Sequence, residues 1–261
     1  MATEVAELTW YHTIELPGGV VTPGEYNTRR AVAKIPFPPD LTGSRCLDVG
    51  THDGFWAFEM ERRGASDVVA IDLDDPRETD ISHPVGPLSE AAVQDRGQRP
   101  HAFAVAHRAL GSSVERRNLS VYALDPEEVG VFDFAFIGTL LLHLRDPVLA
   151  LSAIRTVLRP GGQLLVNDAV SFFLSLRHPR RPAFELTLAP GRPFWWLPNA
   201  VGIRRYLEKA GFEVTDAGGP YFLPRGPGYA RPPIPLKLGS VVNREILRRG
   251  MVHGWALGVR D

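Results

Sequence analysis

The chain passes from a short apolar strand into a helix at Leu47-Asp48-Val49-Gly50-Thr51-His52-Asp53-Gly54-Phe55. The strand is predicted over residues 45–49 and the helix over residues 55–63. Gly50 permits a tight turn between them, and Gly54 lets the backbone approach a ligand closely. The start of the helix directs free N–H groups toward a carboxylate or a phosphate. The stretch therefore predicts a ligand-binding turn at the carboxyl end of a strand.

Strands and helices alternate outward from this turn. Further apolar strands are predicted at residues 67–72, 119–124, 132–137, 163–167, 212–215 and 255–259. Helices are predicted at residues 101–110, after Asp146 and after Asn199, with these two residues as N-caps. Residues 74–100 read as irregular, with one short helix. Continuous apolar strands between helices indicate an α/β fold: a doubly wound, Rossmann-like, seven-stranded, mostly parallel sheet with helices on both faces.

Composition excludes several classes of protein. The 261 residues are 44% hydrophobic with a net charge of −1, which excludes disorder for most of the chain. Cys46 is the only cysteine, which excludes a disulfide scaffold and a cysteine-rich zinc site. The longest apolar run, residues 134–142, is too short to cross a bilayer. The acidic N-terminus lacks the apolar region of a signal peptide, so a cytoplasmic location is expected.

Charge is divided unevenly along the chain. Residues 1–176 hold 15 Lys and Arg against 24 Asp and Glu, whereas residues 177–261 hold 14 against 6. The basic part is suited to an anionic substrate or to RNA. A general preference for surface arginine explains the same counts, and it is the favoured interpretation because the pI is about 6.7.

The turn at residues 50–54 fits a sulfonium ligand better than a dinucleotide. Dinucleotide sites use G-x-G-x-x-G, whereas this turn is G-x-x-x-G. Asp48 and Asp53 flank it, and they would repel a pyrophosphate but favour a cation. Asp72 ends the second strand, 22 residues after Gly50, where an acidic residue binds ribose hydroxyls. An NAD-linked oxidoreductase is therefore disfavoured.

Four stretches in order resemble the motifs of class I S-adenosylmethionine-dependent methyltransferases. They are the turn, the strand ending in Asp72, Phe132-Asp133-Phe134-Ala135-Phe136, and Leu158-Arg159-Pro160-Gly161-Gly162-Gln163-Leu164-Leu165, and they cover residues 45–170. The resemblance implies S-adenosyl-L-methionine as cofactor. It implies binding by residues of the turn and of the strand ends, with Leu124 and Asp125 near the adenine: Asp48, Gly50, Thr51, Asp53, Gly54, Asp72, Leu73, Leu124, Asp125 and Gly138.

A narrower resemblance concerns the segments 136–147, 195–199 and 206–212. They look like the tRNA wobble-uridine carboxymethyltransferase family and its methyltransferase relatives. The tRNA enzymes transfer a carboxymethyl group from carboxy-S-adenosylmethionine to a 5-hydroxyuridine oxygen. They carry Tyr before the histidine, where this chain has Leu142, and no Lys can be placed to pair with the extra carboxylate. These departures favour the ordinary cofactor and another substrate.

The resemblance also suggests catalytic residues. His143 follows the fourth strand, near the methyl group in this fold, and is a candidate general base, although a local packing role is equally compatible. Asp168 ends the fifth strand and is a candidate for orienting the substrate or a base, with a turn-stabilising role as the alternative. Aromatic and polar residues from two segments are candidates for substrate binding, or for packing: Trp10, Tyr11, His12, Trp195, Trp196 and Asn199. No metal site is expected, because the histidines share no ligand spacing.

The predicted organisation is an N-terminal segment, residues 1–44, that closes over the cofactor, followed by a methyltransferase domain, residues 45–261. Insertions are expected at about 171–198 and 217–250. The predicted function is methyl transfer to a small-molecule acceptor, with oxygen favoured and a place in secondary metabolism suggested. The alternatives are a tRNA wobble-uridine-modifying enzyme and a non-catalytic, cofactor-binding partner subunit. No membrane partner is expected, and the sequence does not define the oligomeric state.

Overall fold

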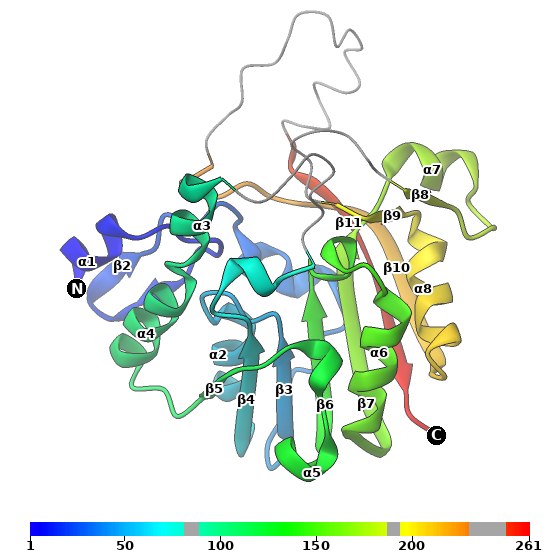
Figure 1. Cartoon of the computed structure of the whole chain (residues 1–261), viewed down its shortest axis with the longest axis horizontal. Coiled ribbons are helices and arrows are strands. Elements are labelled where there is room, and N and C mark those ends of the chain that lie inside the picture. The colour runs from blue at the N-terminus through cyan, green and yellow to red at the C-terminus, as the bar shows by residue number, and fades with distance from the viewer. Residues whose placement is uncertain (81–88, 187–193, 230–248) are drawn as a thin grey trace, which may run out of the picture.

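The computed structural model describes residues 1–80, 89–186, 194–229 and 249–261, and a seven-stranded sheet forms its centre (Figure 1). The strand order is β10-β11-β7-β6-β3-β4-β5. Strand β11 runs antiparallel to β7 and β10, and the other pairs are parallel. The predicted fold class is confirmed. The strands are β3 (Arg45–Val49), β4 (Asp67–Asp72), β5 (Glu115–Asn118), β6 (Phe132–Gly138), β7 (Leu158–Ala169), β10 (Glu213–Leu223) and β11 (Met251–Val259).

Helices cover both faces of this sheet, because successive strand residues point to opposite sides. In β3, Leu47 packs in one core with Ile154 and Ile203, whereas Cys46 packs in the other with Trp56 and Phe103. The helices α6 and α8 therefore cover one face, and α2 and α4 the other. The helices are α1 (Ala2–Glu7), α2 (Phe55–Arg62), α3 (Glu90–Arg96), α4 (Arg99–Leu110), α5 (Pro126–Val129), α6 (Pro147–Thr156), α7 (Phe172–Arg177) and α8 (Ala200–Lys209).

Both predicted helix caps are confirmed. The Asp146 carboxylate accepts a hydrogen bond from the Leu149 N–H at 2.9 Å. The Asn199 amide oxygen accepts one from the Gly202 N–H at 2.9 Å. Each cap satisfies a backbone donor that has no partner within its own helix.

The strand predicted at residues 119–124 is wrong. The structure has β5 at Glu115–Asn118, and residues 121–123 form a 3-10 turn. The reason is that β5 lies at the sheet edge with a Glu-Arg-Arg-Asn sequence, which lacks the apolar pattern of a buried strand. Val121 and Leu124 are apolar because they pack into the core from the turn.

The second predicted insertion begins too early, because residues 217–223 belong to β10. Gly218, Gly219 and Pro220 indicate a loop by sequence, but an edge strand tolerates them. Residues 230–248 lie outside the described residues. The first expected insertion, residues 171–198, contains α7 and the hairpin of β8 (Phe184–Leu186) and β9 (Trp196–Pro198), while residues 187–193 lie outside the described part.

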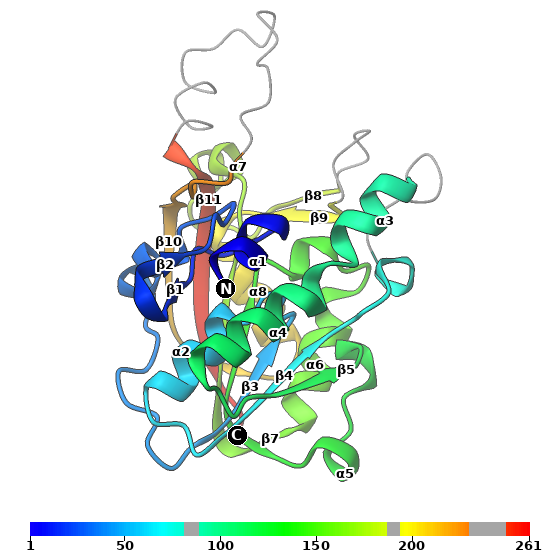
Figure 2. The same cartoon turned by 90° about the vertical axis from the view of Figure 1, so that its left-hand side faces the viewer.

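The N-terminal segment runs across the sheet end toward the last strands. It contains the hairpin of β1 (Glu15–Leu16) and β2 (Val20–Val21). Helix α1 lies beside α4 (Figure 2), where Arg108 and Glu4 form an ion pair of 2.7 Å. Further on, Tyr26 forms β-bridges to both His12 and Arg225. Segments from the two ends of the chain therefore meet.

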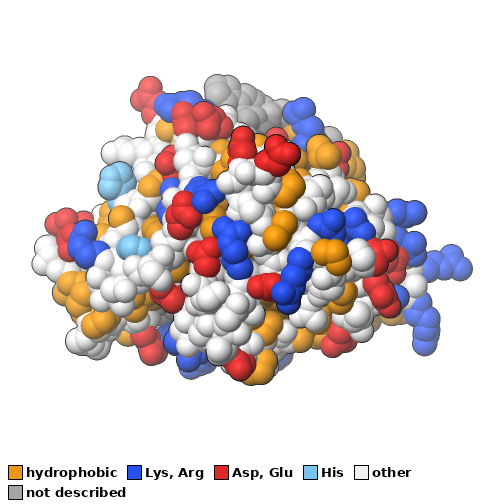
Figure 3. All heavy atoms as spheres, turned by 90° about the horizontal axis from the view of Figure 1, so that it is seen from below, with side chains coloured by type: hydrophobic (Ala, Val, Ile, Leu, Met, Phe, Trp, Pro, Cys, Tyr) orange, Lys and Arg blue, Asp and Glu red, His pale blue; other side chains and the backbone are white. Residues whose placement is uncertain are grey.

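Acidic and basic side chains are interspersed on the surface seen in Figure 3, which is the underside of the view in Figure 1. That face offers no single-sign patch in the described part of the chain. Among the described residues, none of the helices has the length and apolar character needed to cross a membrane.

Candidate functional site

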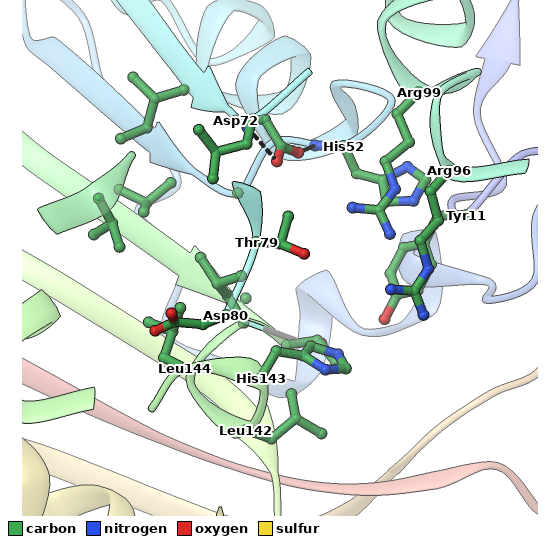
Figure 4. A pocket seen from close by; sticks show the side chains of 18 of the residues that line it. Tyr11, His52, Asp72, Thr79, Asp80, Arg96, Arg99, Leu142, His143 and Leu144 are labelled. Atoms are coloured by element: carbon green, nitrogen blue, oxygen red, sulfur yellow. Dashed lines mark hydrogen bonds between the residues drawn. The ribbon is translucent and has the colours of Figure 1, made fainter. Parts of the chain in front are cut away.

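A cavity of about 430 Å³ opens at the carboxyl ends of β3, β4 and β6 (Figure 4). Gly50 lies at its floor with φ of +75°, and a Cβ there would come within 2.8 Å of the Leu140 side chain. The predicted tight turn is therefore present. Eight of the residues predicted for the ligand site line this cavity: Trp10, Tyr11, His12, Gly50, Asp72, Leu73, Gly138 and His143.

Asp72 is held at the cavity wall by backbone groups. Its carboxylate accepts the N–H of His52 and the N–H of Leu73, both at 2.8 Å. Because a carboxylate can accept further hydrogen bonds, Asp72 retains capacity for two ribose hydroxyls. His52 has φ of +54°, and burial, with a smaller effect of Arg99, lowers the pKa of its ring well below the ordinary value. The neutral ring lies 4.8 Å from that of Tyr11.

Asp53 anchors the N-terminal segment rather than lining the cavity. Its fully buried carboxylate accepts the backbone N–H groups of Tyr11 and His12, both at 2.8 Å, and contacts the His12 ring. The structure thus places Asp53 outside the cavity lining, and its contact with the cofactor stays a prediction. A carboxylate that stabilises a buried backbone turn satisfies the same sequence pattern as one that attracts a cation.

The remaining acidic and small residues of the turn also lie outside the cavity. Asp48 and Thr51 are buried beneath it, and Gly54 lies at the start of α2 with φ of +92°. A Cβ on Gly54 would come within 2.4 Å of the Phe58 ring. These three residues, which the sequence predicts to bind the cofactor, therefore support the turn without lining the cavity.

The predicted adenine neighbours, Leu124 and Asp125, are displaced from the cavity. Leu124 is buried in the core, and Asp125 caps α5 by accepting the Glu127 N–H at 2.9 Å. Residues 119–122 line the cavity instead. This difference has the same cause as the incorrect strand prediction, because β5 ends at Asn118, before residues 119–124.

His143 is presented to the cavity by a short 3-10 turn, Leu141–His143. Its ring lies 5.5 Å from that of Phe194. Asp168 supports this turn from the core, where its buried carboxylate accepts the Leu141 N–H at 2.7 Å and the Ala169 N–H at 2.6 Å. Asp168 does not line the cavity. Its geometry is that of a positioning residue, which is the turn-stabilising alternative.

Trp195, Trp196 and Asn199 brace the site without lining it. The Trp195 backbone N–H donates to the Leu142 carbonyl at 2.7 Å, and the Trp196 indole donates to the Arg145 carbonyl at 3.0 Å. Asn199 is fully buried as the cap of α8. The tryptophans secure the backbone on both sides of His143, and their neighbour Phe194 lines the cavity. A role of the three predicted residues in substrate binding stays a prediction.

A buried hydrogen-bond pair fixes the opposite edge of the cavity. The Thr139 hydroxyl lies 3.0 Å from Nε2 of His253, whose Nδ1 lies 3.2 Å from the Met251 carbonyl. Burial lowers the pKa of His253 to about 4, so the ring is neutral at pH 7. Nδ1 then carries the proton and donates to Met251, and Nε2 accepts from Thr139. Thr139 is thereby held at φ of +54°.

Sequence reasoning missed several cavity residues, including Tyr26, Thr139, Arg96 and Arg99. Arg96 and Arg99 come from the junction of α3 and α4, within a stretch that reads as irregular. Their spacing of three residues gave no signal, because the junction interrupts the helix between them. Among the described residues, no group of three or more metal-ligating side chains is gathered.

Stability should depend on pH through Asp48. Burial raises the pKa of Asp48 to about 7 from an ordinary 3.8, so the folded protein retains a proton that the unfolded chain releases. The stabilisation associated with this proton is complete below about pH 4 and is lost as the pH rises through about 7. The variant Asp48→Asn should therefore gain stability relative to the parent protein between pH 5 and pH 8.

Urea unfolding of the parent protein and of Asp48→Asn, at pH 5 and at pH 8, measures this gain in stability. Asp40→Asn is the control, because Asp40 is exposed and its hydrogen bonds to Thr42 lower its pKa. A stability difference for Asp48→Asn that is the same at both pH values contradicts the assignment.

Comparisons with known proteins identify the family of the chain. A family model described as "Methyltransferase domain" matches residues 24–217. The tRNA U34 carboxymethyltransferase of Idiomarina loihiensis is 29% identical over 185 residues, which are 68% of this chain and 48% of that protein. The ubiquinone biosynthesis O-methyltransferase of Acinetobacter baylyi is 29% identical over 127 residues, 49% of this chain and 44% of that protein. The chain thus spans about half the length of these curated relatives.

A solved structure extends the comparison to the fold. It is the 1,6-didemethyltoxoflavin-N1-methyltransferase of Burkholderia thailandensis, with S-adenosylhomocysteine bound. The TM-score is 0.51 at 16% identity, with 84% of this chain and 72% of that chain covered. At this identity the likeness concerns the fold alone.

Proposed function

Because the chain belongs to the methyltransferase domain family, whose cofactor is S-adenosylmethionine, we propose that it methylates an oxygen of a small-molecule acceptor. The observation that carries the proposal is that Asp72 and His143 line one cavity of about 430 Å³. A cavity of this size is typical of small-ligand sites. When bound, the cofactor supplies a methyl group activated by the positive sulfonium.

In the proposed mechanism the residues of the chain bind and orient the reactants. Asp72 accepts hydrogen bonds from the ribose hydroxyls, and Gly50 and Gly138 leave room for the cofactor at the strand ends. His143 accepts the proton of the acceptor hydroxyl as its oxygen lone pair forms the new bond to carbon. In such a transfer the electron pair of the broken sulfur–carbon bond would remain on the sulfur of the cofactor. Asp168 fixes the backbone turn that sets the position of His143.

Calorimetric titration tests the cofactor assignment. Titrations with S-adenosylmethionine, S-adenosylhomocysteine and NAD should show binding of the first two only. Acceptors are then sought among hydroxylated small molecules by the production of S-adenosylhomocysteine. Binding of NAD, or of neither sulfur compound, would overturn the proposal.

Modification of a tRNA wobble uridine is the second candidate, favoured by the relationship to the tRNA U34 carboxymethyltransferases. Against it stands the position before His143, where the tRNA enzymes carry Tyr. Here Leu142 is buried and its carbonyl accepts the Trp195 N–H. Titration with bulk tRNA at two salt concentrations distinguishes the candidates, because binding to RNA phosphates weakens steeply with salt. Salt-sensitive binding would replace the small acceptor with tRNA.

Replacing Asp72 should weaken cofactor binding. Asp72→Ala removes the acceptor for the ribose hydroxyls, so we expect the affinity for S-adenosylhomocysteine to fall by about 1–3 kcal/mol. Calorimetry measures this loss. The matched control is Asp74→Ala, two residues further on, where an exposed carboxylate pairs with Arg116 at 2.6 Å. Unchanged affinity in Asp72→Ala would exclude Asp72 from the cofactor site.

A further inference from the structure

Two arginines face the cavity and form no ion pair in the part of the chain that the structure describes. Arg96 ends α3 and Arg99 begins α4, and both line the cavity with Tyr11. Figure 4 shows the Arg96 guanidinium beside Tyr11 and the Arg99 guanidinium near His52, with His143 on another side of the open space. Within the described ranges, neither guanidinium lies within ion-pair distance of a carboxylate. Two neighbouring arginines that form no ion pair among the described residues are suited to binding an anionic ligand in the cavity.

Hydrogen bonds hold the segment that carries these arginines in place. Thr9 joins the α3–α4 junction to the N-terminal segment: its N–H donates to the Gln98 amide oxygen at 3.2 Å, and its hydroxyl to Asp95 at 2.8 Å. The Nη1 atom of Arg96 is buried and has no hydrogen-bond partner among the described residues. A buried, unsatisfied charged donor is costly, and negative charge beside the cavity-lining part of the Arg96 guanidinium would offset that cost.

The acidic residues of the cavity do not neutralise the pair, because most are engaged elsewhere. Asp72 accepts two backbone N–H groups, as described above. Asp80 accepts the Tyr122 hydroxyl at 2.6 Å and the Arg145 N–H at 3.0 Å. Asp95 is bonded to Thr9, Glu25 pairs with Arg225 at 3.5 Å, and Glu78 is exposed to solvent.

We propose that Arg96 and Arg99 bind a carboxylate or phosphate group of the methyl acceptor, so that the substrate is an anionic hydroxyl compound. The inference rests on the proposed function. An anionic acceptor complements the positive sulfonium, and its charged group would be held beside Tyr11 while its hydroxyl approaches His143. The other source of the same chemistry is the carboxylate of the cofactor's own methionine part, which the experiment must separate.

The test uses inorganic phosphate as the probe and calorimetry as the readout. The parent protein and the double variant Arg96→Gln/Arg99→Gln are titrated with phosphate, free and saturated with S-adenosylhomocysteine, at constant ionic strength. Both are also titrated with S-adenosylhomocysteine and with 5′-methylthioadenosine, which lacks the methionine carboxylate. Arg108→Gln is the matched control, since Arg108 lies on α4 but is exposed and paired with Glu4. Circular dichroism melting establishes that each variant is folded.

We expect saturable phosphate binding to the S-adenosylhomocysteine complex, weakened about tenfold or more in the double variant and unchanged in Arg108→Gln. Binding of S-adenosylhomocysteine should be the same in all three proteins. If the double variant loses affinity for S-adenosylhomocysteine but not for 5′-methylthioadenosine, the arginines hold the cofactor carboxylate and the proposal is wrong. Phosphate binding that is absent, or equal in parent and double variant, also overturns it. If S-adenosylhomocysteine fails to bind at all, the proposed function fails, while the phosphate titration of the free proteins still decides whether the pair binds anions.

Discussion

His143→Ala is expected to slow methyl transfer about a hundredfold while leaving the affinity for S-adenosylhomocysteine unchanged. The expected loss is typical of removing a general base. Binding should be spared because the backbone of the turn that carries His143 is held by Asp168 and Trp195. Steady-state production of S-adenosylhomocysteine, with the acceptor found in the screen, measures the rate.

His101→Ala controls for the removal of a histidine in general, because His101 is exposed on α4. A His143→Ala enzyme that turns over at the parent rate would reduce His143 to a wall of the cavity. The pH dependence of the rate adds a second readout. If the rate of the parent enzyme falls at low pH and the rate of His143→Ala does not, His143 acts as a base. A purely structural role would not produce this difference.

Asp53→Ala is expected to lower the free energy of unfolding by about 2–4 kcal/mol and to release the N-terminal segment from the turn. The variant leaves two buried N–H groups, those of Tyr11 and His12, without an acceptor, and each such group costs about 1–3 kcal/mol. Urea unfolding measures the stability. Limited proteolysis measures the release, with faster cleavage expected between residues 9 and 26.

Asp40→Ala is the matched control, because the Asp40 carboxylate is exposed and accepts local hydrogen bonds from Thr42. The loss of the cavity wall should also weaken S-adenosylhomocysteine binding in Asp53→Ala. Equal stability and equal proteolysis of Asp53→Ala and Asp40→Ala would show that the N-terminal segment is held by other contacts.

The central sheet could be predicted from the sequence because its strands are buried on both faces. β3, β4 and β6 each contain a buried apolar stretch, and Gly50 follows β3, Asp72 ends β4 and Gly138 ends β6. The edge strands lack this signal. β5 is polar, and β10 contains glycines and a proline that are typical of loops, so their limits depend on pairing partners that no local pattern reveals.

The candidate site could be predicted only in part, for a related reason. Gly50 follows β3 and Asp72 ends β4. Because the ends of these strands are evident in the sequence, the place of both residues at the cavity could be predicted. Asp53 and Asp168 are acidic residues at equivalent strand ends, but their carboxylates turn inward to backbone N–H groups. The direction of a side chain, which separates a ligand from an anchor, is decided by tertiary packing. Arg96 and Arg99 lie at the junction of α3 and α4. Their place at the cavity is also decided by tertiary packing and not by a local sequence pattern.

The contact between the N-terminal segment and residues 222–225 has a consequence for synthesis on the ribosome. The Lys34 ammonium donates to the Phe222 carbonyl, 188 residues later, and Thr139 depends on His253, which lies in β11 between β7 and β10. A nascent chain that has emerged only as far as β10 therefore has an unfinished sheet and an open cavity wall. Contacts so distant in sequence also slow folding. We therefore expect the sheet and the cavity wall to be completed only after residues 251–259 leave the exit tunnel.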